Sequence, residues 1–173
     1  MSLRRIPSVN RPSFSAVAAD CLDEVYRYLL MLTADATLAE DLTSATFEKA
    51  LTRWRRFDPT RGAATTWLCA IARNTALDHF RSESRRRRRE DSYALREPTL
   101  DDAPFATGLS AELEQALQAL SASEREVIAL RVVLDLDAQT AADVLGISRT
   151  ACSMRLGRAL QKLEERMTAD ALA

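Results

Sequence analysis

The 173-residue sequence predicts an all-α protein in which a flexible acidic linker joins two small helical domains. Helix breakers are scarce, with four glycines and five prolines, and aromatic residues make up only 6% of the chain, which favours long helices over a sandwich or barrel. Hydrophobic residues reach 47%, enough for a packed core. Apolar residues recur at helical spacing in two blocks, and a stretch with two prolines and many acids separates them.

The first domain is expected over residues 15–89, after a flexible N-terminal segment of residues 1–14. Its first helix is predicted over residues 21–32, because apolar side chains recur there at intervals of three and four residues. Thr37, followed three residues later by Glu40, matches a capping box. This match predicts the start of a second helix.

The second helix is expected to end before Pro59, which cannot continue it. A third helix is predicted to start near Thr65 or Thr66 and to run toward a block of arginines. Trp54 and Trp67 could act as stacking platforms for bases, but both lie on the apolar stripes of their helices. Core packing is therefore the favoured role for the two rings.

The linker is predicted over residues 90–108 and the second domain over residues 109–168. Leu113, Leu117 and Leu120 indicate a short first helix in this domain. Residues with capping chemistry mark the boundaries of the helices that follow. They are Ser121 with Glu124, Asp137, Gly146 and Ser148.

The last two helices of this domain have the layout of a helix-turn-helix: a short helix, a glycine turn and a longer basic helix. Leu156, Leu160 and Leu163 are expected to pack the longer helix inward. An ordinary helical hairpin with a solvated basic face is the alternative interpretation. Several polar residues near the N-terminus of the longer helix would face outward, where arginines can bond guanine edges. They are Arg149, Ser153, Arg155 and Arg158.

The formal net charge is only −1, but the charges fall into blocks of opposite sign. Residues 20–48 carry seven acids against one arginine, and residues 90–147 carry twelve acids against three arginines. Residues 50–89 carry eleven arginines against three acids, and residues 148–166 carry five basic residues against two acids. The basic blocks suit nucleic acid, whereas the acidic blocks suit a different partner.

The third helix combines arginines with a residue that can contact bases. Arginines on it can neutralise phosphates, and Asn74 can bond a base edge. The loop of residues 57–64 is polar and contains glycine, which suits it to gripping an unstacked base. The five consecutive arginines at 85–89, taken alone, are better explained as a solvated helix end. The residues that recur mostly on one side of the helix are Arg73, Asn74, Asp78, Arg81 and Arg85.

The sequence offers no constellation for catalysis or metal binding. Cys21, Cys69 and Cys152 are odd in number and far apart, and the single His79 cannot complete a zinc site with them. We therefore expect no enzyme activity, no cofactor and no metal. No apolar run approaches the roughly 20 residues of a membrane span, and no secretory signal is evident, so a cytoplasmic protein without membrane contact is expected.

Several motifs occur together and in a fixed order. Residues 39–43 read AEDLT, and residues 67–78 contain WL, IARN and ALD, followed by Arg81. Residues 124–131 read EREVIALR, and residues 145–148 read LGIS. Together these motifs resemble the extracytoplasmic-function sigma factors of bacterial RNA polymerase. The resemblance identifies the first domain as sigma region 2, a helical bundle, and the second as sigma region 4, a helix-turn-helix.

The resemblance implies a subunit that directs core RNA polymerase to promoter DNA and is controlled by an anti-sigma factor. It implies contacts with the clamp helices of the largest polymerase subunit and with the flap. The residues implied at the clamp helices are Glu40, Asp41, Leu42, Ser44 and Glu48. Those implied in recognising and melting the −10 element are Asp58, Thr60, Arg61, Thr65, Arg73, Asn74, Asp78, Arg81 and Arg85. Those implied at the −35 element are Ser148, Arg149, Thr150, Ser153, Met154, Arg155 and Arg158.

The alternative function is a dimeric helix-turn-helix transcriptional regulator that binds promoters without melting DNA. Such a regulator has no need of an acidic docking helix paired with a melting helix, so the N-terminal motifs favour the sigma factor. An enzyme such as a nuclease is a distant third, because no nucleophile with its base and no ligand cluster is present.

Overall fold

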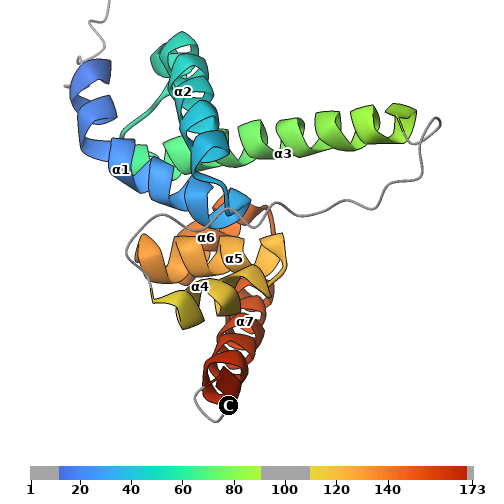
Figure 1. Cartoon of the computed structure of the whole chain (residues 1–173). Helices are drawn as coiled ribbons and strands as arrows, with labels where there is room; N and C mark the ends of the chain where they lie inside the picture. Colours follow the sequence, from blue (N-terminus) through green and yellow to red (C-terminus); the bar gives the residue numbers. More distant parts are fainter. Residues whose placement is uncertain (1–11, 91–109, 171–173) are drawn as a thin grey trace, which may run out of the picture.

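In the computed structural model, which describes residues 12–90 and 110–170, helices make up both halves of the molecule (Figure 1). The described residues contain no strand, so the predicted all-α class is confirmed. The expected N-terminal segment and linker lie almost entirely outside the described residues. The N-terminal elements are α1 (Phe14–Thr33), α2 (Ala36–Arg53), the 3-10 turn η1 (Trp54–Arg56) and α3 (Ala64–Glu90). The C-terminal elements are α4 (Ala111–Gln118), α5 (Ala122–Ile128), the π-helical turn η2 (Ala129–Val133), α6 (Ala138–Leu145) and α7 (Arg149–Asp170).

α1 begins earlier than its apolar stripe predicts. Its first residue is Phe14, and Ser13 caps the helix by accepting a hydrogen bond from the Ala16 N–H at 3.2 Å. The prediction of a start at residue 21 is therefore wrong. The first turns contain mainly small residues, so capping chemistry marks this start better than hydrophobic periodicity does.

The junction between α1 and α2 is a tight turn defined by local hydrogen bonds. Ala34 ends α1 in the left-handed conformation, with φ of 57°, and its N–H donates to the Leu30 carbonyl at 2.8 Å. Asp35 then caps α2, because its carboxylate accepts from the Leu38 N–H at 3.0 Å. The predicted capping box at Thr37 is wrong, since Thr37 already lies within the first turn of α2.

An aromatic cluster ties the end of α2 to the start of α3. The rings of Trp54 and Phe57 are stacked with centroids 4.9 Å apart, and the Trp67 ring lies 5.9 Å from Trp54 and 5.3 Å from Phe57. Phe14 of α1 meets Trp54 edge to face at 5.4 Å. Both tryptophans pack against the core, so the favoured core role is confirmed, and the cluster fixes both ends of the loop of residues 57–64.

The helix boundaries of the C-terminal half follow the predicted capping residues. Ser121 and Glu124 form the predicted capping box at the start of α5. Asp137 caps α6 by accepting from two backbone N–H groups. Gly146 ends α6 with φ of 66°, a conformation that glycine adopts without steric cost. The Ser148 hydroxyl accepts from the Ala151 N–H at 3.1 Å at the start of α7.

The buried face of α7 is displaced from the one predicted. Cys152 and Ala159 are fully buried, and Leu156 and Leu163 are half-buried against the core. These positions are spaced by four, three and four residues. Leu160 lies one position beyond Ala159, about 100° around the helix, and is 41% exposed. The expectation that Leu160 packs inward is therefore wrong.

The two halves of the molecule pack directly against each other. α1 lies against α5 and η2, and α3 lies against α6, as Figure 1 also shows. Tyr28 and Leu29 of α1 belong to the same hydrophobic cluster as Val127 and Leu130 of the C-terminal half, and all four are fully buried. The N-terminal and C-terminal helices therefore share one core.

Candidate nucleic-acid interface

α3 carries a row of polar and charged side chains along one side. Arg81 lies 3.6 Å from the Asp78 carboxylate, forming an ion pair within one turn on the helix surface. Arg73 differs from the rest, because it is half-buried and its Nε donates to a carboxylate oxygen of Glu126 in α5 at 2.8 Å. The structure thus brings the predicted row together except for Arg73, which is engaged by the C-terminal half. The exposed members are Asn74, Asp78, Arg81 and Arg85.

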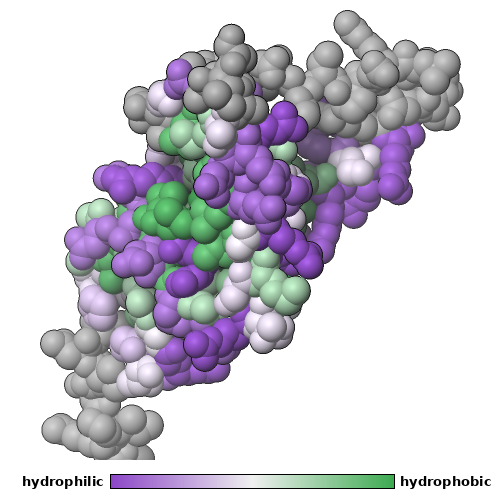
Figure 2. Space-filling model, turned by 90° about the horizontal axis from the view of Figure 1, so that it is seen from below, coloured by the Kyte–Doolittle hydropathy of each residue, from purple (hydrophilic) through white to green (hydrophobic). Residues whose placement is uncertain are grey.

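The C-terminal end of α3 projects beyond the rest of the molecule and carries the arginines of residues 85–89 (Figure 1). Where this end projects on the right of Figure 2, the surface is hydrophilic. Arg86 lies 3.2 Å from the Glu83 carboxylate, and the Arg89 Nε donates to the Arg85 carbonyl. Basic side chains complement the partial negative charge at a helix C-terminus, so they stabilise α3 as well as offering positive charge to phosphates.

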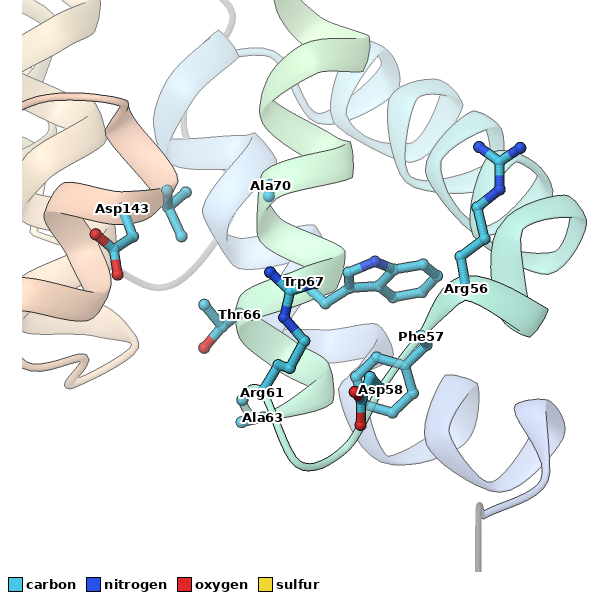
Figure 3. A pocket seen from close by; sticks show the side chains of 11 residues that line it. Arg56, Phe57, Asp58, Arg61, Ala63, Thr66, Trp67, Ala70 and Asp143 are labelled. Carbon is cyan, nitrogen blue, oxygen red and sulfur yellow. The ribbon is translucent and has the colours of Figure 1, made fainter. Parts of the chain in front are cut away.

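The loop before α3 borders a hollow of about 430 Å³ (Figure 3). Asp58 shapes the loop, because its carboxylate accepts from both the N–H and the hydroxyl of Thr60, at 3.0 and 2.7 Å. Gly62 has φ of 154°, which favours glycine. The hollow offers aromatic, cationic and anionic groups together. Its N-terminal lining includes Arg56, Phe57, Asp58, Arg61 and Trp67.

Two residues of α6 also line this hollow. They are Asp143 and Val144. In Figure 3, Asp143 projects from α6 on the side of α3 where Thr66 and Arg61 also lie. The hollow is therefore shared between the two halves of the molecule, and an acidic side chain of the C-terminal half borders it.

Thr65 does not join the other loop residues predicted to bind nucleic acid. Its hydroxyl donates to the Glu24 carboxylate of α1 at 2.8 Å and lies 3.4 Å from the Cys21 sulfur. Burial raises the pKa of the Cys21 thiol. The side chain thus fastens the start of α3 to α1.

α2 presents an acidic outer face. The exposed polar residues predicted there are Glu40, Asp41, Ser44 and Glu48. Leu42 is only 5% exposed and packs in the core, so it holds α2 in place behind this face. Leu51, which the sequence reasoning did not single out, is 59% exposed and lies three residues after Glu48. Leu51 therefore adds one apolar side chain to the acidic face of α2.

The N-terminal end of α7 presents the predicted polar surface. Arg155 is half-buried, whereas the other residues predicted to contact the −35 element are exposed. Met154 is 54% exposed, so an apolar side chain is available between the arginines for contact with a thymine methyl group. The exposed residues are Ser148, Arg149, Thr150, Ser153, Met154 and Arg158.

Glu126 is a functional candidate that the sequence reasoning missed. It is 5% exposed, and one carboxylate oxygen accepts from the Tyr28 hydroxyl at 2.9 Å as well as from Arg73. Burial and the adjacent Glu126 carboxylate raise the pKa of Tyr28 well above its usual value, so the phenol remains a donor. The sequence pattern that could have identified Glu126 as buried is its position directly before Val127 and Ile128, which are buried in the same helix.

The described residues contain no group of three or more histidine, cysteine, aspartate or glutamate side chains that could hold a metal ion. Within the same part of the chain, no helix is long and apolar enough to cross a membrane.

Comparisons with known proteins match both halves of the chain. A family model described as Sigma-70 region 2 matches residues 18–86, and one described as Sigma-70, region 4 matches residues 110–163. The RNA polymerase sigma factor CarQ of Myxococcus xanthus is 33% identical over 159 residues, covering 88% of this chain and 88% of that protein. The ECF RNA polymerase sigma factor BldN of Streptomyces coelicolor is 31% identical over 86% of this chain, which spans 58% of that relative's length.

Two solved structures are similar over nearly the whole chain. The sigma factor RpoE in complex with the anti-sigma factor NepR from Bartonella quintana gives a TM-score of 0.76 at 24% identity, covering 91% of this chain and 98% of that one. CnrH in complex with the cytosolic domain of CnrY gives a TM-score of 0.65 at 26% identity, covering 94% and 92%. The arrangement of helices is thus shared with both.

Proposed function

Because the chain belongs to the extracytoplasmic-function sigma factors of RNA polymerase, we propose that its two halves recognise the two promoter elements while α2 docks on the core enzyme. The observation that carries this division is the presence of three surfaces of different chemistry. α2 is acidic, α3 with its preceding loop is polar and cationic beside a hollow, and the start of α7 is basic.

The −10 element is assigned to α3 and the loop. Exposed Arg81 and Arg85 can neutralise phosphates, and Asn74 can bond a base edge on the same side of the helix. The hollow lined by the half-buried Trp67 and the exposed Arg61 offers a ring and a guanidinium to a base that has left the stack. Melting then requires no chemistry by the protein itself, because capture of an unstacked base shifts the equilibrium toward the open strands.

The −35 element is assigned to the start of α7. In a helix-turn-helix the N-terminal residues of the second helix contact base edges in the major groove. Arg149 and Arg158 can bond guanine edges or phosphates, and Met154 offers an apolar contact. The capping serine, Ser148, is available to a phosphate at the helix N-terminus.

The acidic face of α2 is assigned to the clamp helices of the polymerase, with the flap as the contact of the C-terminal half. We also propose an anti-sigma partner that covers the acidic face. The exposed Leu51 beside Glu48 supports this, because apolar and acidic groups together suit a protein surface better than they suit DNA. The structural relative CnrH was solved with a protein partner, the cytosolic domain of CnrY.

The test is transcription by core RNA polymerase with and without the protein, followed by mapping of the RNA 5′ ends. We expect starts at one class of promoters only when the protein is present. Arg149→Ala should reduce these starts, whereas Ser82→Ala, an exposed position on α3 outside the predicted set, should leave them unchanged. Absence of protein-dependent starts on genomic templates would contradict the proposal.

A further inference from the structure

The row of polar side chains on α3 continues beyond Arg85 to Arg88. Intervals of four, three, four and three residues separate its exposed members, which are Asn74, Asp78, Arg81, Arg85 and Arg88. Intervals that alternate in this way keep side chains on one side of a helix with 3.6 residues per turn. We call Arg81, Arg85 and Arg88 the arginine row.

Two members of the arginine row form no ion pair in the part of the chain that the structure describes. No carboxylate among the described side chains pairs with Arg85 or Arg88. The nearby ion pair joins Arg86 to Glu83 at 3.2 Å. Glu83 precedes Arg85 by two residues and therefore lies about 200° around the helix from it. The guanidinium groups of Arg85 and Arg88 are thus available to an external anion.

The stability of α3 does not account for the arginine row. A cation gains from the partial negative charge of a helix C-terminus only within the last turn. α3 ends at Glu90, so Arg81 and Arg85 lie before that turn. Like charges three or four residues apart repel each other on a helix surface. An anion bound along the row would offset this repulsion.

The arginine row extends away from the end of α3 that is assigned to the unstacked base. The loop of residues 57–64 precedes α3, whereas the row lies toward the projecting C-terminal end (Figure 1). Arg88 follows Asn74 by 14 residues, which is about 21 Å at about 1.5 Å per residue. That length spans about six base pairs at about 3.4 Å each. The row is therefore long enough to follow DNA beyond the −10 element.

Paired DNA adjoins the −10 element on the side of the −35 element. Strand opening extends from the −10 element toward the transcription start, and a helix-turn-helix reads the −35 element as a duplex with its major groove intact. The end of α3 that leads away from the captured base therefore meets duplex DNA. Bidentate base contacts need side chains held in a fixed geometry, whereas attraction between exposed guanidinium groups and phosphates does not.

We propose that the arginine row binds backbone phosphates of the DNA duplex directly upstream of the −10 element, over at most about six base pairs. The contact is independent of base sequence and lengthens the surface on which α3 holds the promoter. The inference rests on the proposed function, because that function places α3 at the −10 element.

The test measures binding of core polymerase, saturated with the full chain, to two promoter fragments. One is unmodified, and in the other neutral methylphosphonates replace the phosphates of about six base pairs directly upstream of the −10 element. We expect the parent to bind the modified fragment more weakly. Arg85→Gln/Arg88→Gln should lose most of this difference, because the guanidinium groups are gone. Arg27→Gln removes a charge at an exposed position of α1 and should retain the full difference.

Salt dependence on the unmodified fragment gives a second readout. Each phosphate contact contributes about 0.9 to the slope of log affinity against log salt concentration, so the glutamine variant should lower the slope by about 1.8. Its affinity relative to the parent should therefore rise about twelvefold between about 50 and 200 mM salt. Arg85→Lys/Arg88→Lys keeps both charges and should behave as the parent. A lysine variant that behaves like the glutamine variant would overturn recognition of phosphates by charge.

The two proposals fail in different ways. If the parent and the glutamine variant lose the same affinity on the modified fragment, while the parent supports transcription with core polymerase, the upstream contact is overturned and the sigma function stands. If the parent supports no transcription with core polymerase, the proposed function is contradicted together with the contact that rests on it.

Discussion

At the scale of single residues, position along α3 decides which side chains are available to DNA. Arg73 and Asn74 are neighbours in sequence, yet Arg73 is engaged by Glu126 and Asn74 is exposed. The sequence predicted both as DNA contacts from their spacing. It could not predict the different surroundings of Arg73, because its partner lies 53 residues further along the chain and carries no local signal.

Asn74→Ala should impair promoter opening more than initial duplex binding. Asn74 is uncharged, so its loss removes a base-edge hydrogen bond and leaves phosphate contacts intact, an effect of about 1–3 kcal/mol. The measurement is the fluorescence of 2-aminopurine placed in the −10 element, compared with a gel-shift affinity for duplex promoter at fixed salt. Ser82→Ala is the control, and equal losses in both measurements would contradict the assigned position.

The lowered pKa of Glu124 makes the free energy of unfolding depend on pH in the acid range. The hydrogen bond from Lys162, followed by one from the Ser121 N–H, lowers the pKa of Glu124 from 4.5 to about 2. A lowered pKa in the folded state stabilises the protein above pH 4.5, and this contribution is lost as the pH falls toward 2. Urea midpoints measured across this range should fall less steeply for Glu124→Gln than for the parent. Parallel curves would show that the lowered pKa is absent.

At the scale of elements, capping chemistry predicted boundaries better than hydrophobic periodicity did. Ser121, Asp137 and Gly146 are placed as predicted, because each acts on backbone groups within a few residues. The start of α2 was misassigned because Asp35 and Thr37 both have capping side chains, and the left-handed turn at Ala34 selects Asp35. Capping side chains thus limit the positions at which a helix can begin or end, and the surrounding backbone conformation determines which position is used.

The identity of the buried face of α7 can be tested by substitution at two adjacent positions. Ala159→Leu should destabilise the fold by about 1–3 kcal/mol, because extra methylene groups must enter a fully buried position. Leu160→Ala, at the adjacent and 41% exposed position, should cost less than about 1 kcal/mol. The measurement is the free energy of unfolding from urea titration. A larger loss for Leu160→Ala would restore the leucine stripe predicted from the sequence.

At the scale of the whole molecule, a near-zero net charge conceals surfaces for different partners. The acidic blocks of residues 20–48 and 90–147 cancel the basic blocks of residues 50–89 and 148–166 in the sum. The acidic face of α2 and the basic start of α7 nevertheless lie on different helices. The sequence predicted this division from charge blocks. It did not predict that α1 and α3 share a core with α5, η2 and α6, because pairing between distant helices depends on side-chain fit rather than on local pattern.

We expect this protein to enable core polymerase to open promoter DNA. Permanganate footprinting of unpaired thymines at a promoter identified by RNA 5′-end mapping tests it most directly. We expect reactive thymines in the −10 element only when polymerase and the protein are both present, and weaker reactivity with Asn74→Ala. Thymines that stay unreactive in the presence of both, or that react equally with polymerase alone, would contradict it.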